Sequence, residues 1–158
     1  MFLIRVVTVD EEKLSLKHLN SMLKSFKDVK IVGSYQQPST ALSKIKSLQP
    51  HIIIFDISMS EMDGFKFAEQ AASLFPGVFI VFLSTYDGFA LKAFEVGAYD
   101  YILKPLSEDR LNKLIKRAKH DLTHKIEKNI SVPEKHIQNQ FSNFITANKA
   151  DSIIVISK

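Results

Sequence analysis

The stretch that decides the fold is His51-Ile52-Ile53-Ile54-Phe55-Asp56, in which four consecutive apolar residues lead into an acidic one. A strand that is apolar at every position is expected to be buried on both faces, as strands of a parallel sheet are. A second run of this kind covers residues 78–83, and further strand-like runs lie on either side of the pair. The predicted strands are residues 3–9, 30–35, 51–55, 78–83 and 99–103.

Amphipathic segments alternate with these strands. Each carries apolar residues at three- and four-residue spacing, the period that places them on one face of a helix. The predicted helices are residues 12–26, 38–48, 64–75 and 87–96, and a last one begins at about residue 107. Strand followed by helix, repeated five times, favours right-handed crossovers. The sequence therefore predicts an α/β fold with a five-stranded doubly wound parallel sheet.

The composition excludes several classes of protein. Of the 158 residues, 46% are hydrophobic, 24% are charged, and the net charge is +4. These values exclude a disordered chain and do not by themselves indicate a nucleic-acid or membrane surface. The absence of cysteine excludes a disulfide framework, a thiolate metal site and a cysteine nucleophile. No apolar run approaches the roughly 20 residues of a membrane helix, and the N-terminus lacks a signal-peptide pattern, so we expect a cytoplasmic protein.

The character of the sequence changes after Leu122. Residues 1–122 carry all five strand–helix repeats, whereas residues 123–140 are polar and contain Pro133, which predicts a helical extension and a linker. Strand-like runs return at residues 141–145 and 152–156. Because two strands cannot bury a core alone, we expect residues 141–158 to begin a further, truncated domain.

Residues suited to chemistry follow the carboxyl ends of the predicted strands. They are Asp10 and Glu11 after the first strand, Asp56 after the third, Ser84 after the fourth and Lys104 after the fifth. In a doubly wound sheet these ends meet at one crevice. Neighbouring carboxylates repel one another unless a cation joins them, and Mg²⁺ is the hard cation that oxygen ligands suit. A lysine and a hydroxyl suit phosphoryl oxygens, and an aspartate beside a metal can act as a nucleophile toward phosphate.

Four segments, taken in order, resemble the receiver domain of two-component response regulators over roughly residues 3–122. They are residues 9–12 (VDEE), 55–64 (FDISMSEMDG), 82–86 (FLSTY) and 97–105 (GAYDYILKP). The resemblance implies the CheY-like, flavodoxin-like (βα)5 receiver fold. It also implies a phosphoacceptor signalling domain, with at most self-dephosphorylation, in place of an enzyme.

The resemblance further implies how the acidic residues act. Asp56 would accept a phosphoryl group from a sensor histidine kinase in a Mg²⁺-dependent reaction. Asp10, Glu11, Asp56 and the backbone carbonyl of Ser58 would hold the Mg²⁺ ion. Glu11 stands where the family usually has Asp, so its carboxylate reaches one methylene further. Ser60 stands where Pro is usual, which predicts a less rigid loop after Asp56.

Other roles carried over by the resemblance concern the last two strands. Ser84 and Lys104 would contact the phosphoryl group, and Tyr101 would be the switch aromatic that moves inward with Ser84. The Lys104–Pro105 peptide bond would be cis, which only proline makes inexpensive. Thr85 replaces the small residue usual beside Ser84 and would narrow access to the phosphoacceptor.

Residues 89–101 most resemble regulators of the LytR/AgrA type, which carry a LytTR DNA-binding output domain. The strand-like runs in residues 141–158 fit the opening of such a domain. The resemblance thus implies that phosphorylation switches homodimerisation and output, with transcription regulated through a DNA-binding domain largely beyond Lys158. It implies no membrane partner.

Other interpretations of the same residues stay open. The chain could be an interaction module with a receiver fold that works without phosphorylation. It could also be a haloacid-dehalogenase-like phosphatase, although that class has a second Asp two positions after the first, where Ser58 stands here. Asp10 and Glu11 could cap a helix, and Tyr101 could be a packed aromatic. Asp100 is expected to be a cap or a surface charge.

Overall fold

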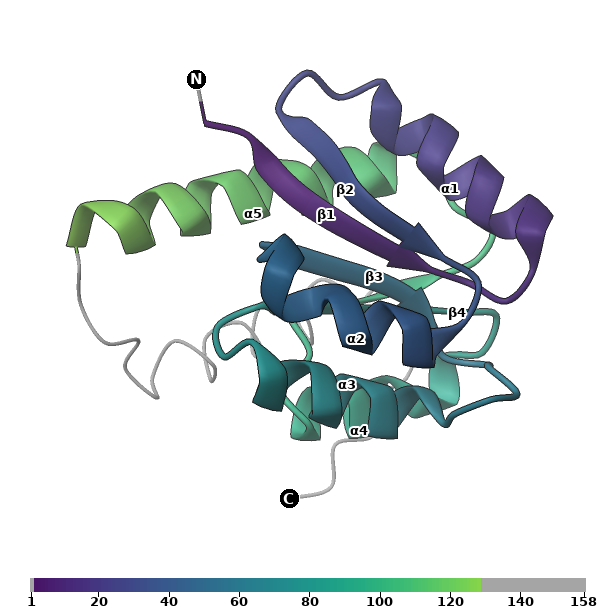
Figure 1. The fold of residues 1–158 in the computed structure, drawn as a ribbon. Coiled ribbons are helices and arrows are strands. Elements are labelled where there is room, and N and C mark those ends of the chain that lie inside the picture. Colours follow the sequence, from purple (N-terminus) through teal and green to yellow (C-terminus); the bar gives the residue numbers. More distant parts are fainter. Residues whose placement is uncertain (1, 129–158) are drawn as a thin grey trace. The chain divides into compact units, whose positions relative to one another are not determined.

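A computed structural model of the protein describes residues 2–128, with 126–128 described as helix backbone only. Its sheet contains five parallel strands in the order β2-β1-β3-β4-β5 (Figure 1). They are β1 (Ile4–Val9), β2 (Val29–Tyr35), β3 (Ile52–Asp56), β4 (Phe79–Ser84) and β5 (Asp100–Leu103). The predicted five-stranded doubly wound parallel sheet is confirmed, with each strand within one residue of its expected ends.

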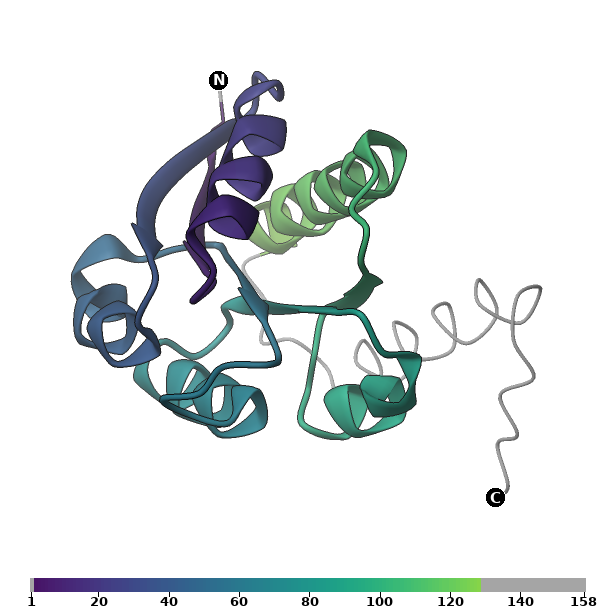
Figure 2. The same cartoon turned by 90° about the vertical axis from the view of Figure 1, so that its right-hand side faces the viewer.

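Helices cover both faces of the sheet. They are α1 (Lys13–Lys24), α2 (Pro38–Leu48), α3 (Gly64–Leu74), α4 (Ala90–Glu95) and α5 (Glu108–Lys128). In Figures 1 and 2, α2, α3 and α4 lie on one face, and α1 and the beginning of α5 lie on the other. The prediction of one α-helix over residues 87–96 is wrong in its first turn, because Asp87–Phe89 form a 3₁₀ turn, η1, before α4. Gly97 follows α4 with φ +87°, a left-handed conformation that glycine adopts without a steric cost.

The apolar run in β3 lies at the centre of the core. All four of its apolar residues, Ile52 to Phe55, are completely buried. The Phe55 ring packs against Phe67 of α3 at 4.6 Å between centroids and against Phe82 of β4 at 4.8 Å. Burial on both faces therefore anchors the strand that ends at Asp56.

One expectation about a charged residue is wrong. Asp100, at the start of β5, is neither a cap nor a surface charge, because it is completely buried. Its carboxylate pairs with Arg110 at 2.6 Å and with Arg117 at 3.5 Å, both on α5. A buried carboxylate needs such partners to offset the loss of water. Both partners come from the next helix. Arg110 lies 10 residues after Asp100, and Arg117 also donates a hydrogen bond to the carbonyl oxygen of Tyr99, 18 residues before it.

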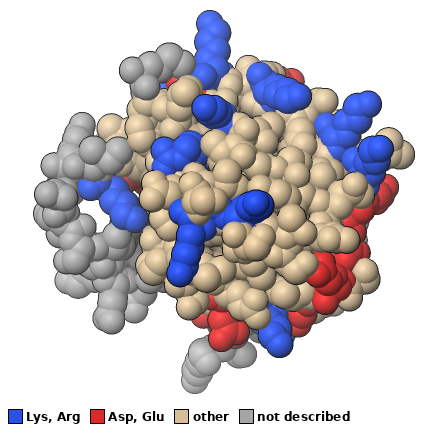
Figure 3. Space-filling view, viewed as in Figure 1, with Lys and Arg blue, Asp and Glu red and all other residues tan. Residues whose placement is uncertain are grey.

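The compact unit that carries this fold extends from Met1 to His120. Helix α5 continues to Lys128, whereas residues 129–140 of the predicted linker and the predicted start of a further domain, 141–158, lie outside the described residues. None of the helices in the described part of the chain has the length and hydropathy needed to cross a membrane. On the face drawn in Figure 3, Lys and Arg side chains are spread among other residues and form no continuous basic patch.

Candidate functional site

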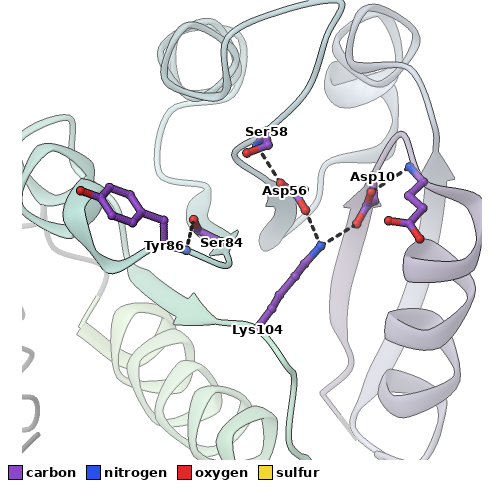
Figure 4. Close-up of polar contacts among 7 residues, drawn as sticks. Asp10, Asp56, Ser58, Ser84, Tyr86 and Lys104 are labelled. Atoms are coloured by element: carbon purple, nitrogen blue, oxygen red, sulfur yellow. Dashed lines mark hydrogen bonds and ion pairs between the residues drawn. The ribbon is translucent and has the colours of Figure 1, made fainter.

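The strand register brings Asp10 and Asp56 to the same edge of the sheet. Val9 of β1 pairs with Phe55 of β3, so the two aspartates are the next residues on neighbouring strands. Ser84 of β4 pairs with Leu103 of β5, and Lys104 follows directly. The Lys104 side chain then reaches back across the strand ends to both carboxylates (Figure 4).

Lys104 forms two ion pairs at this edge. Its Nζ atom lies 3.2 Å from Asp10 Oδ2 and is also hydrogen-bonded to Asp56 Oδ2. The three side chains are only 19%, 5% and 13% exposed for Lys104, Asp10 and Asp56 respectively. Two partly buried carboxylates therefore share one ammonium group.

The electrostatic balance of the site follows from this burial. Desolvation raises the pKa of Asp10, and this exceeds the opposing effects of the Glu12 N–H group and the Lys104 charge. Desolvation alone would lower the pKa of Lys104, but the hydrogen bonds and charges of Asp56 and Asp10 raise it on balance. The two carboxylates thus favour the ammonium form of Lys104, whereas burial disfavours the charged form of Asp10.

The loop after β3 holds Asp56 in position. The Ser58 N–H group donates to Asp56 Oδ1 at 2.7 Å, and the Ile57 N–H group donates to the Leu83 carbonyl of β4 at 2.9 Å. Helix α3 begins directly against this loop at Gly64. A Cβ atom on Gly64 would lie 2.7 Å from the Ile57 carbonyl oxygen and 2.9 Å from its Cα atom, so a side chain there has no room.

Glu11 lies elsewhere than expected for a metal ligand. Its Oε1 atom accepts hydrogen bonds from Ser60 N at 2.6 Å, Ser60 Oγ at 2.8 Å and Glu61 N at 3.0 Å. The Glu61 N–H group, followed by the Ser60 hydroxyl, lowers the pKa of Glu11. Within residues 2–128, no three acidic or histidine side chains are arranged to hold a metal ion. The structure thus brings together Asp10, Asp56 and Lys104 and directs Glu11 to the β3–α3 loop.

The peptide groups of Tyr86 connect two further predicted residues, Ser84 and Tyr101. The Tyr86 N–H group donates to Ser84 Oγ at 3.0 Å (Figure 4), and the Tyr101 hydroxyl donates to the Tyr86 carbonyl oxygen. Ser84 and Tyr101 are buried, and burial raises the pKa of the Tyr101 hydroxyl, partly offset by the Ser84 side chain. Sequence analysis missed this connection because a backbone group carries no sequence signal.

The end of β5 is tied to the end of β4. The Lys104 N–H group donates to the Ser84 carbonyl oxygen at 2.7 Å, and the Lys104–Pro105 peptide bond is cis. The site is therefore a carboxylate at the end of a buried strand, with a second carboxylate, a lysine and a hydroxyl on the neighbouring strand ends. This combination of groups suits binding of a cation and of phosphoryl oxygens.

Comparison with known proteins agrees with this arrangement. The response regulator receiver domain family matches residues 6–116. The sensory transduction protein LytT of Bacillus cereus is 36% identical over 125 residues, covering 79% of this chain and 51% of LytT. The transcriptional regulatory protein BtsR of Salmonella typhimurium is 36% identical over 121 residues, covering 75% of this chain and 49% of BtsR. The chain spans about half the length of these relatives.

Solved structures show the same fold. The response regulatory domain of the protein mrkE from Klebsiella pneumoniae superposes with a TM-score of 0.69 at 29% identity, covering 76% of this chain and 98% of that one. The relatives named LytT confirm the resemblance to regulators of the LytTR type. The chain therefore belongs to the response regulator receiver domain family, the signalling domains of two-component systems.

Proposed function

We propose that Asp56 is the phosphoacceptor of a response regulator and receives its phosphoryl group from a sensor histidine kinase. The observation that carries this proposal is the ion pair between Lys104 and Asp56 at the end of β3, beside the buried carboxylate of Asp10. It combines a nucleophilic oxygen with a fixed positive charge in one place. Phosphoryl transfer depends mainly on such positioning and on neutralising charge.

The groups around Asp56 suit each part of the transfer. An Asp56 carboxylate oxygen forms a new bond to phosphorus as the bond from phosphorus to the donor breaks, and the departing group takes the electron pair. Ser58 N–H holds the other oxygen of the carboxylate at 2.7 Å. Lys104 would move its contact from the free carboxylate to the phosphoryl oxygens, where its charge offsets the added negative charge.

The residues present fit a Mg²⁺ ion. Asp10 is a buried acidic side chain beside Asp56, and burial raises its pKa; a divalent cation bound there would favour its carboxylate form. The ligands would be Asp10, Glu11, Asp56 and the backbone carbonyl of Ser58, all of them oxygen donors. When bound, the ion would neutralise charge on the phosphoryl oxygens.

Phosphorylation would act through Ser84 and Tyr101. Ser84 Oγ now accepts from the Tyr86 N–H group, and Tyr101 donates to the Tyr86 carbonyl oxygen. A Ser84 hydroxyl that turns toward a phosphoryl group gives up the first of these bonds. The segment that leads into η1 and α4 then loses this hydrogen bond to β4, which would change the surface available for homodimerisation and output.

The output we propose is DNA binding by a LytTR-like domain that begins near residue 141 and continues largely beyond Lys158. In this proposal the protein is cytoplasmic and regulates transcription as a phosphorylation-dependent homodimer. Support comes from the relatives: LytT and BtsR extend about as far again as this chain matches, and BtsR is named a transcriptional regulator.

The test is phosphoryl incorporation from labelled acetyl phosphate with Mg²⁺, comparing the wild type with Asp56→Asn. Asp63→Asn is the matched control, because Asp63 lies in the same loop and caps α3 by accepting from Phe65 N, which Asn also does. We expect stable, Mg²⁺-dependent labelling of the wild type and of Asp63→Asn, and none of Asp56→Asn. An unreactive wild type, or an equally labelled Asp56→Asn variant, would refute the proposal. Multiple-turnover hydrolysis of a phosphoester would instead favour the phosphatase.

A further inference from the structure

Two positions at which this chain departs from the usual receiver pattern are in direct contact. Glu11, in the β1–α1 loop, accepts hydrogen bonds from both the N–H group and the hydroxyl of Ser60, in the β3–α3 loop, at 2.6 and 2.8 Å. We propose that these two residues form a latch that holds Glu11 away from the metal site, so that Ser60 sets the Mg²⁺ concentration the site requires. This inference rests on the proposed function.

The latch requires both departures together. A proline at position 60 has no N–H group and no hydroxyl, so two of the three donors to Glu11 would be lost, leaving Glu61 N at 3.0 Å. An aspartate at position 11 would be one methylene shorter and would fall back from the loop. Hydrogen bonds to a carboxylate are stronger than those between neutral groups, which gives the contact enough strength to compete with another ligand.

In the latched position Glu11 is not grouped with the other proposed metal ligands. All three hydrogen bonds converge on Oε1, and among the described residues no group of three acidic side chains is arranged to hold a metal ion. Asp10 and Asp56 already face each other across Lys104. In the proposed latch, Glu11 joins them only by giving up the hydrogen bonds from Ser60, so metal binding and the closed latch compete.

The consequence is quantitative. A ligand that binds only the open form sees its affinity reduced by the fraction of molecules that are open. A latch closed in about nine molecules out of ten would weaken Mg²⁺ binding about tenfold. A mutation that opens the latch and retains the Glu11 carboxylate should therefore strengthen Mg²⁺ binding by up to about tenfold.

The experiment is a calorimetric titration of Mg²⁺ into the unphosphorylated chain at constant ionic strength. It compares the wild type with Ser60→Pro, Ser60→Ala, Glu11→Asp and the double variant Glu11→Asp/Ser60→Pro. We expect Ser60→Pro to lower the Mg²⁺ Kd by about three- to tenfold, and Ser60→Ala, which keeps the N–H donor, to lower it less. In the Glu11→Asp background, Ser60→Pro should change the Kd by less than about twofold, because the contact is already absent.

Two further measurements complete the test. Ser43→Ala is the control, since the Ser43 hydroxyl on α2 donates to its own helix at 2.7 Å and has no role in the site. In ¹H–¹⁵N spectra of the wild type, the Glu61 amide, a donor to Glu11, should shift toward its position in metal-free Glu11→Ala as Mg²⁺ is added.

The outcomes separate this inference from the proposal on which it rests. Wild-type Mg²⁺ binding with an unchanged Kd in Ser60→Pro and Ser60→Ala would overturn the latch and leave the metal site in place. Weaker binding by Ser60→Ala and Ser60→Pro would also overturn it, because Ser60 would then be positioning Glu11 as a ligand. No Mg²⁺ binding by any variant would overturn the metal site, and the latch with it.

Discussion

Replacing Lys104 with Met tests whether this lysine is what keeps two carboxylates together in the folded protein. Lys104 Nζ contacts Asp10 at 3.2 Å and Asp56 more closely, and the three side chains are between 5% and 19% exposed. A hydrogen bond to a charged group contributes about 1.5–3 kcal/mol. Taking the lower end for both contacts gives about 3 kcal/mol. Removing the lysine also removes the cost of burying its ammonium group, and this offsets part of the loss.

We therefore expect Lys104→Met to lower the free energy of unfolding by about 2 kcal/mol at pH 7 without Mg²⁺. The assay is urea unfolding followed by far-ultraviolet circular dichroism, because the chain has no tryptophan. With an m value of about 1.5 kcal/mol/M, the midpoint should fall by about 1.3 M. Adding Asp10→Asn to Lys104→Met should restore part of the loss, since one of the two uncompensated carboxylates is removed.

The matched control is Lys119→Met. Lys119 forms an ion pair of 2.7 Å with Asp28, but the two side chains are 48% and 32% exposed. Such a pair contributes less than about 1 kcal/mol. The reasoning is refuted if Lys104→Met costs no more than Lys119→Met, or if Asp10→Asn restores nothing in the double variant.

Three more predictions concern stability. Gly64→Ala should lower the free energy of unfolding by about 1–3 kcal/mol in urea, because the new Cβ atom meets the Ile57 backbone; Gly33→Ala, whose Cβ atom meets only side-chain atoms, should cost less. Asp10→Asn should be more stable than the metal-free wild type at pH 7. A carboxyl group whose pKa is raised by folding destabilises the folded protein as pH rises. The stability gained by Asp10→Asn should therefore vanish as pH falls toward 3.8, the ordinary pKa of Asp, and a gain that persists there would contradict this prediction. Tyr101→Phe should cost about 0.5–1.5 kcal/mol in thermal unfolding, and an unchanged midpoint would exclude a contribution from its hydroxyl.

Sequence analysis was most successful where a residue's environment depends on its own neighbours in the chain. The consecutive apolar residues of β3 predicted burial on both faces, and all four are completely buried. The polar residues that follow each strand could be placed at one edge because parallel strands end on the same side. Asp10, Asp56 and Lys104 meet there, although in the chain Lys104 is 94 residues from Asp10 and 48 residues from Asp56.

Side-chain partners from distant segments were harder to foresee. Asp100 was expected to be a cap or a surface charge, yet it is buried against Arg110 and Arg117. That burial is possible only because α5 packs over β5 and supplies the opposite charge. The pattern of α5 by itself assigns Arg117 to the solvated face, since periodicity records which positions are apolar and not which charges are paired.

The sequence by itself determined the order of the elements, the parallel sheet and the edge at which the acidic residues, the hydroxyl and the lysine gather, because hydrophobic periodicity and strand direction are properties of local segments. Only the tertiary structure decided where each carboxylate points. Asp10 and Glu11 are adjacent in the chain, but one faces Lys104 and the other accepts hydrogen bonds from Ser60, 49 residues away. The physical reason is that a side chain's direction is set by the donors that the fold brings within about 3 Å, and those donors belong to other loops.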